Sequence, residues 1–302
     1  MRAKSSSKKV GPLVPKRPGF QGHSPLKLRA ARRAAPTSSH AFSKPAQAAS
    51  SIRTLALSLV NTSLLGGVFA GARRVAFFRL PRHEWTIEGD FTEHVRGRVD
   101  RVVLCSVVPA HTAALVGQIE RTYRTTPGIL TADASHGLTI GYRDPRQLGT
   151  DRLAAALGAQ ALFPRRNVIV IDCGTATTVT ALRREGVLAG GAIFPGLALW
   201  PEVLARRTAQ LPQIAPGRPR AAVGRSPGEG IASGVYFGHV GAIRETVARV
   251  RAEAFGRAAC VVVATGGHAA LFVRENLFTR LVPDLSLIGL CSFAERCFDG
   301  TS

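Results

Sequence analysis

An aspartate at the start of a predicted helix is the strongest candidate for acid–base chemistry in this chain of 302 residues. Asp151 follows a polar, glycine-containing segment (141–150), and Arg152 stands beside it. The run DRLAAALGAQAL (151–162) is rich in alanine and leucine and predicts a helix. A helix N-terminus favours an ionised carboxylate, so an aspartate there is also typical of a first-turn acid without catalytic function. The local sequence offers a general base and leaves the capping role open.

Short polar turns after apolar runs are candidates for binding phosphate. The first turn is Asn61-Thr62-Ser63, and the second contains Gly174 and Thr175 directly after Asp172. Backbone N–H groups and hydroxyls in such turns can surround phosphate oxygens, and the acid can hold a cation. A third turn, ATGGHAAL (264–271), lies between a predicted strand and a predicted helix and could take a nucleotide. Each turn is a weak signal by itself, because glycines after strands are common.

The elements that carry the first two turns resemble each other. LALSLVNTSLLGGVF (55–69) and IVIDCGTATTVTAL (169–182) share the layout strand, polar turn, strand. Ser58 and Asp172 occupy corresponding places near the strand ends. This internal repeat predicts a duplicated domain with a cleft between its halves, and two unrelated hairpins remain the alternative.

The wider pattern alternates short apolar runs with helical stretches, which predicts an α/β protein. Strands are expected at 55–60, 63–69, 74–80, 101–108, 167–172, 177–182 and 259–264. Helices are expected at 109–122, at 151–162, at about 229–254 and after 265–267.

Several enzyme and site classes are excluded by missing motifs. The chain has no Walker A sequence, no G-x-S-x-G and no H-E-x-x-H, and it has no lysine after Lys44. Phosphoryl transfer would have to use arginine, hydroxyls, backbone amides and metal, as in actin-like kinases. The five cysteines lack disulfide or zinc spacing, which favours a reducing compartment, with the cytoplasm as the default. No apolar run approaches the ~20 residues that a membrane span needs.

Basic charge is concentrated at the beginning of the chain. The formal net charge is +21, and residues 1–50 hold 11 Lys or Arg and no acid. We expect a basic, disordered extension at 1–52, an N-terminal lobe at 53–165 and a C-terminal lobe at 166–302. A start assigned too far upstream and an organelle transit peptide are the alternatives for the extension. Nucleic-acid binding is expected, if at all, only through this tail.

A series of motifs in order is similar to that of type III pantothenate kinases from about Thr54 to Leu290. They are NT (61–62), SVVP (106–109), Tyr142 with GTDR (149–152), DCGTATT (172–178), GGAIFPG (190–196), TAQLP (208–212), GEGIASGVYFG (228–238), TGG (265–267) and PDLSLIGL (283–290). The resemblance implies a duplicated actin-like fold of the acetate and sugar kinase superfamily, usually a homodimer. It also implies phosphorylation of pantothenate by ATP, the first step of coenzyme A synthesis.

The same resemblance assigns expected roles to individual residues. Asp151 matches the family's proton acceptor, and Asp172 matches the ligand of a monovalent cation, potassium or ammonium. Mg²⁺ is expected to accompany ATP. The ATP-contacting positions match Ser58, Leu59, Val60, Asn61, Thr62, Ser63, Leu64, Leu65 and Thr175. The pantothenate-binding positions match Tyr142, Gly149, Thr150, Asp151, Arg152 and Pro227.

Four positions depart from the family pattern. Ser58 and Val60 stand where the family has an Asp and a Gly, so one negative ligand expected for Mg²⁺ is missing. Thr180 replaces a further Asp, and Pro227 replaces a Thr that contacts pantothenate. Two functions therefore remain open: a working pantothenate kinase, or a kinase-derived regulatory or transcription accessory factor. Phosphorylation of a different small alcohol is a narrower third option.

Overall fold

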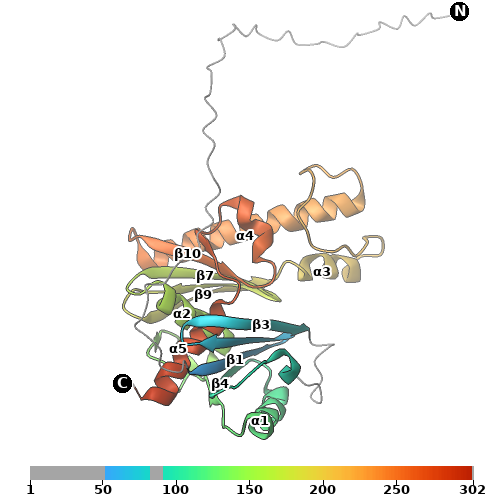
Figure 1. Cartoon of the computed structure of the whole chain (residues 1–302). Helices are drawn as coiled ribbons and strands as arrows, with labels where there is room; N and C mark the ends of the chain where they lie inside the picture. Colours follow the sequence, from blue (N-terminus) through green and yellow to red (C-terminus); the bar gives the residue numbers. More distant parts are fainter. Residues whose placement is uncertain (1–51, 82–90, 301–302) are drawn as a thin grey trace, which may run out of the picture. The chain divides into compact units, whose positions relative to one another are not determined.

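The computed structural model describes residues 52–81 and 91–300. The predicted basic extension lies, apart from Ile52, outside the described residues. Within the described ranges the chain forms two mixed sheets and the helices that cover them (Figure 1).

The first sheet has five strands in the order β3-β2-β1-β4-β5. Their bounds are β1 Arg53–Val60, β2 Ser63–Ala70, β3 Arg73–Pro81, β4 Arg101–Ser106 and β5 Gly128–Ile129. The central strand β1 is buried on both faces, as its unbroken apolar sequence predicts. The edge strand β3 is largely exposed and carries a bulge opposite Val68 and Phe69.

The second sheet has six strands in the order β11-β10-β7-β8-β9-β6. Their bounds are β6 Thr139–Ile140, β7 Asn167–Cys173, β8 Ala176–Leu182, β9 Val187–Pro195, β10 Cys260–Thr265 and β11 Arg280–Leu281. The predicted strands 167–172, 177–182 and 259–264 correspond to β7, β8 and β10.

The two sheets repeat one topology. In the first, β3, β2 and β1 are antiparallel neighbours, and β4 and then β5 are added parallel to β1. In the second, β9, β8 and β7 are antiparallel, and β10 and then β11 are added parallel to β7. The two hairpins that resemble each other in sequence are therefore equivalent elements, which confirms the predicted duplication.

Helices form layers outside and between the sheets. The α-helices are α1 Pro109–Tyr123, α2 Thr150–Leu162, α3 Leu199–Arg207, α4 Pro227–Phe255 and α5 Leu285–Asp299. Figure 1 shows α1 outside the first sheet, α4 outside the second, and α2 with α5 between them. Short 3-10 helices are η1 Phe91–His94, η2 Pro145–Gln147 and η3 Ala269–Glu275. The helix expected after 265–267 is η3.

The central layer is tightly packed because glycines face backbone across the α2–α5 crossing. A Cβ on Gly289 of α5 would overlap the carbonyl oxygen of Ala154 and would lie 2.6 Å from the backbone nitrogen of Gly158 in α2. Residues of both sheets and both helices share the hydrophobic core around this crossing, among them Ala56, Leu153, Val170 and Leu290. The backbones of α2 and α5 therefore approach each other so closely that no side chain fits between them at Gly289.

No helix in the part of the chain that the structure describes is long and apolar enough to cross a membrane. All five cysteines are free, and Cys105, Cys173 and Cys291 are buried. Burial raises the pKa of the Cys105 and Cys173 thiols to about 12 each, so these thiols stay protonated. These cysteines therefore act as small hydrophobic side chains.

Candidate active site

A cavity of about 380 Å³ brings together the turns and the acids singled out in the sequence. The β1–β2 turn and the β7–β8 turn both line it, and so do the first turn of α2 and the glycine turn after β10. The polar residues in its wall include Ser58, Asn61, Thr62, Asp151, Asp172, Thr175, Thr178 and Thr265. The predicted base and both predicted phosphate turns therefore share one cavity.

The two threonine turns meet directly. The Oγ1 atoms of Thr62 and Thr175 lie 3.2 Å apart, so either hydroxyl can donate to the other. Both turns belong to hairpins at equivalent places in the two sheets, and the duplication therefore sets one against the other. Hydroxyls and backbone amides from two sides can converge on a polyanion placed there.

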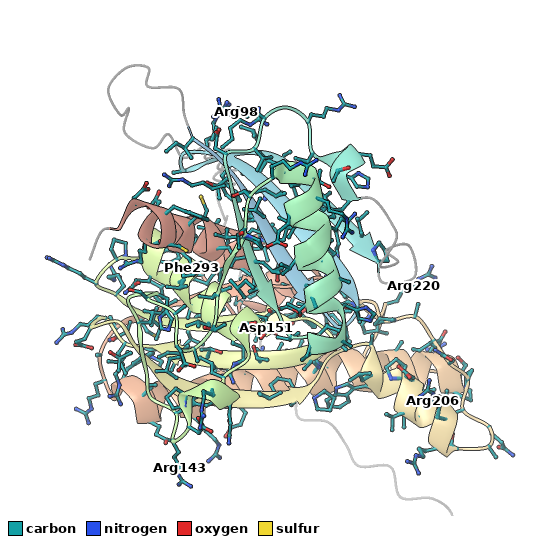
Figure 2. The ribbon with its side chains drawn as sticks, turned by 90° about the horizontal axis from the view of Figure 1, so that it is seen from below. Arg98, Arg143, Asp151, Arg206, Arg220 and Phe293 are labelled. Atoms are coloured by element: carbon teal, nitrogen blue, oxygen red, sulfur yellow. The ribbon has the colours of Figure 1, made fainter. Side chains whose placement is uncertain are left out.

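Asp151 is fixed by the start of α2. Gly149 is the N-cap residue, and Thr150 donates its hydroxyl to the carbonyl oxygen of Ser106, 2.9 Å away at the end of β4. One Asp151 oxygen accepts the backbone N–H of Arg152 at 2.8 Å. Asp151 is thus both a first-turn acid and a cavity residue. In the view of Figure 2 it lies near the middle, whereas Arg143 and Arg206 lie near the outline of the molecule.

The carboxyl of Asp172 has a raised pKa, as expected for a buried acid that lies near another acid. Burial, and after it the charge of Asp151, raise the pKa of its carboxyl to about 7, while Arg79 opposes both effects. A bound cation would relieve the cost of burying this carboxylate beside a second one. Among the described residues, no cluster of three or more His, Cys, Asp or Glu could hold a metal. The donor set fits a weakly charged ion shared with backbone and hydroxyl oxygens better than a carboxylate-caged divalent ion.

Arg152 is a buried cation with one unused donor. Its Nε donates to the hydroxyl of Thr180 at 3.1 Å, and Nη1 donates to the hydroxyl of Tyr142. The guanidinium also lies over the Tyr142 ring, 5.7 Å from its centroid. Its Nη2 is buried and has no hydrogen-bond partner within the described ranges. Because Thr180 is neutral, no carboxylate at that position offsets this charge, and an anionic ligand would.

The first turn divides into cavity residues and core residues. Ser58, Val60, Asn61, Thr62 and Leu65 line the cavity. Ser58 is buried, and its Oγ accepts the Cys105 thiol at 3.3 Å. The remaining predicted contacts are buried: Leu59 and Leu64 lie in the core on the α1 side, and the hydroxyl of Ser63 has no partner among the described residues. Any role of these three toward a ligand would use backbone atoms.

Of the predicted pantothenate positions only Asp151 lines the cavity; Tyr142, Gly149, Thr150 and Arg152 do not, and neither does Pro227. Pro227 is exposed in the first turn of α4, after the N-cap residue Ser226, whose Oγ accepts the N–H of Glu229 at 3.3 Å. Proline suits this position because an N–H in the first turn of a helix has no acceptor within the helix, so its absence removes no hydrogen bond.

Some cavity residues were not predicted. Arg79 and Phe77 reach the cavity from β3, and Ser286 reaches it from the start of α5. Gly266 and Gly267 line it as well, and the glycine turn had been noted as a nucleotide turn. The alternation along β3 could have placed Phe77 and Arg79 on one face, but nothing local to β3 indicates that this face adjoins the second hairpin.

Comparisons with known proteins agree with the geometry. The family model described as type III pantothenate kinase matches residues 55–249. A type III pantothenate kinase of Legionella pneumophila is 38% identical over 245 residues, which cover 78% of this chain and 96% of that protein. One of Dehalococcoides mccartyi is 34% identical over 249 residues, covering 79% and 94%.

The fold is also similar to a solved structure from Campylobacter jejuni, named as a Baf family transcriptional activator. The TM-score is 0.53 at 15% identity, and the match covers 80% of this chain and 98% of that one. The duplicated α/β topology agrees with the actin-like kinase fold expected for the type III pantothenate kinase family. With its fold, its cavity and these relatives, the chain belongs to the type III pantothenate kinase family.

Proposed function

We propose that this chain transfers the γ-phosphoryl group of ATP to the primary hydroxyl of pantothenate, giving 4'-phosphopantothenate for coenzyme A synthesis. The observation that carries the proposal is that Asp151 lines the same cavity as both threonine turns. Relatives named type III pantothenate kinase that match most of the chain support it, and they do not favour the regulatory alternative.

Asp151 is assigned the role of general base. The oxygen that does not accept the Arg152 N–H can take the proton from the attacking hydroxyl. Help of this kind contributes about 10²–10⁴ in rate, and positioning with charge neutralisation supplies much of the rest.

The two threonine turns are assigned to the phosphates of ATP, which enters as its magnesium complex. Thr62 and Thr175 present hydroxyls from opposite sides, and the backbone from Ser58 to Leu65 follows the first side. Ser58 gives the magnesium ion a neutral oxygen where the family pattern has a carboxylate. Water or phosphate oxygens would complete the coordination shell.

Pantothenate is assigned to the residues around Arg152, which is buried and does not itself line the cavity. The buried, unpartnered Nη2 would pair with the pantothenate carboxylate, and Tyr142 holds the guanidinium in place. Gly149 and Thr150 fix the adjacent backbone. Asp172 is assigned to a potassium or ammonium ion, which would hold its carboxylate in the charged form.

A homodimer is proposed from family membership together with an exposed apolar surface. Ile193 on β9, Val203 on α3 and Phe237 on α4 are 63%, 53% and 41% exposed, and α4 packs against both α3 and β9. Burying such a patch is a common reason for association. The free cysteines fit a reducing compartment, and we propose a cytoplasmic enzyme.

The division into lobes at 53–165 and 166–302 stays a prediction. Two elements pack with the lobe to which their sequence position does not assign them. β6 precedes residue 166 but extends the second sheet, and α5 follows it but packs on the first sheet. Binding of nucleic acid by the basic tail likewise stays a prediction for residues outside the described ranges.

A direct assay tests the proposed function. Purified full-length protein is incubated with ATP, Mg²⁺, pantothenate and either potassium or ammonium, and phosphopantothenate is followed by mass spectrometry. Asp151→Asn should lower turnover by at least about 10²-fold, because the amide cannot accept the proton. Asp299→Asn is the matched control, since Asp299 is an exposed acid that pairs with Arg101 outside the cavity.

The result that would refute the proposal is absence of product from folded wild-type protein under every cation condition. Equal loss of activity in Asp151→Asn and Asp299→Asn would instead reject the role assigned to Asp151. Circular dichroism and thermal unfolding of each variant separate loss of chemistry from loss of fold.

A further inference from the structure

The cavity contains a basic side chain that none of the assigned roles uses. Arg79, on the edge strand β3, is the one Lys or Arg among the residues that line the cavity. Every lysine of the chain lies at or before Lys44, so none occurs in the described ranges. A tri-anionic or tetra-anionic phosphate tail bound beside Asp151 and Asp172 has Arg79 as the nearest fixed positive charge in this wall.

Arg79 is directed toward the glycine turn after β10. A Cβ on Gly267 would lie 2.8 Å from Arg79 Nη1, so the guanidinium occupies the space that a side chain at Gly267 would need. Arg79 also lowers the pKa of His268, after the larger effect of burial, and it opposes the rise in the pKa of Asp172. Although Arg79 belongs to the first sheet, its charge therefore acts on two titratable groups of the second half, His268 and Asp172.

Arg79 forms no ion pair with an acid of the described ranges, although its charge acts on Asp172. The contrast with Arg74 on the same strand is informative, because Arg74 forms an ion pair with Asp284 and lies over the Phe77 ring at 5.2 Å. Arg74 is thus engaged in holding β3 to the start of α5. Arg79 is exposed, lines the cavity and forms no hydrogen bond with a residue of the described ranges.

We propose that Arg79 binds the phosphate tail of the nucleotide and bridges it to the glycine turn at Gly266 and Gly267. The proposal deepens the proposed function and rests on it only for the identity of the nucleotide as a triphosphate. The planar guanidinium can donate two parallel hydrogen bonds to phosphate oxygens, which a single lysine ammonium cannot reproduce. In this chain Ser58 supplies no charge for the magnesium ion, so a protein cation opposite the phosphates carries more of the neutralisation.

The test separates phosphate contacts from contacts to the nucleoside. Binding of adenosine, AMP, ADP and the non-hydrolysable ATP analogue AMPPNP is measured by calorimetry on full-length wild type, Arg79→Gln and Arg79→Lys. The matched control is Arg73→Gln, which changes an exposed arginine of the same strand that does not line the cavity. We expect Arg79→Gln to weaken AMPPNP binding by at least about tenfold and to leave adenosine binding unchanged. Arg79→Lys should fall between Arg79→Gln and the wild type.

Kinetics provide a second readout. Arg79→Gln should lower kcat/KM for ATP by about 10²-fold, while KM for pantothenate stays within about twofold. Two results would overturn the proposal: Arg79→Gln binds the phosphate series as the wild type does, or it loses adenosine and AMPPNP affinity equally. If Arg79→Gln does not fold, Arg79→Lys decides the question by the same comparison. Because the binding series contains no pantothenate, its outcome is independent of whether pantothenate is the acceptor.

Discussion

His239 gives a pH-dependent stability that can be worked out from the structure. This histidine of α4 is 0% exposed, and its Nε2 lies 3.1 Å from the Thr177 hydroxyl in the second hairpin. Its ring stacks on Phe272 with centroids 5.4 Å apart. Burial, and to a smaller extent the nearby His268, lower the pKa of His239 to about 4. The neutral ring is therefore strongly preferred in the folded protein.

The sign follows from proton binding in the two states. The folded-state pKa is depressed, so the unfolded chain binds the proton more readily as the pH falls below about 6.5. The stabilisation from neutral His239 is present above pH 6.5 and is lost as the pH falls toward 4. Between pH 7 and pH 5 the loss amounts to about 2 kcal/mol of unfolding free energy.

The assay compares the wild type with two variants that cannot titrate at this position. Urea unfolding of the wild type, His239→Gln and His239→Leu is measured at pH 5, 6 and 7. At pH 7 each variant should be less stable by about 1–3 kcal/mol, because ring packing is lost. At pH 5 the difference in unfolding free energy between the wild type and each variant should be smaller by about 2 kcal/mol than at pH 7. Titrations of groups that do not interact with His239 are common to the three proteins and cancel in the difference; His268 is the coupled group.

A difference that stays constant from pH 7 to pH 5 would refute the reasoning, since it would mean that His239 takes up its proton equally in both states. Narrowing in one variant alone would point to a new interaction of that replacement.

Three further predictions concern the cavity and its support. Asp172→Asn should abolish the response of kcat to potassium at constant ionic strength, because the amide lacks the charge that attracts the ion; an unchanged potassium titration would contradict the cation assignment. Thr180→Asp should raise KM for pantothenate about tenfold or more with KM for ATP unaffected, because the new carboxylate would pair with Arg152; steady-state kinetics in both substrates decide this. Gly289→Ala should lower the unfolding free energy by about 1–3 kcal/mol or more and reduce kcat, because the methyl group overlaps α2 backbone; unchanged thermal unfolding would show that the helices can separate without cost.

Local sequence was sufficient for the elements that carry the phosphate turns. β1 and β7 have unbroken apolar sequences followed by polar turns, and a central strand buried on both faces requires that pattern. The internal repeat then predicted that both turns face one cleft, and the contact between Thr62 and Thr175 agrees with it. Asp151 could be placed at a helix start because glycine precedes an alanine- and leucine-rich run.

Long-range features were beyond local reasoning. Strands of two residues, such as β5 and β6, have no periodicity to detect and form only through their neighbours. The function of Arg79 depends on which face of β3 adjoins the second sheet, and this is decided by packing between the halves. The unpartnered nitrogen of Arg152 likewise emerges only when Tyr142 and Thr180 are brought around it.

The backbone contact between Gly158 and Gly289 has a consequence for biosynthesis. The α5 helix is translated after every other element described. It nevertheless packs directly against α2 in the layer between the two sheets. A nascent chain that has completed both hairpins would still lack the support that orients its first-turn carboxylate. Competence for catalysis would thus arrive late and in one step, and a ribosome-stalled chain ending before Leu285 should be inactive even with both sheets translated.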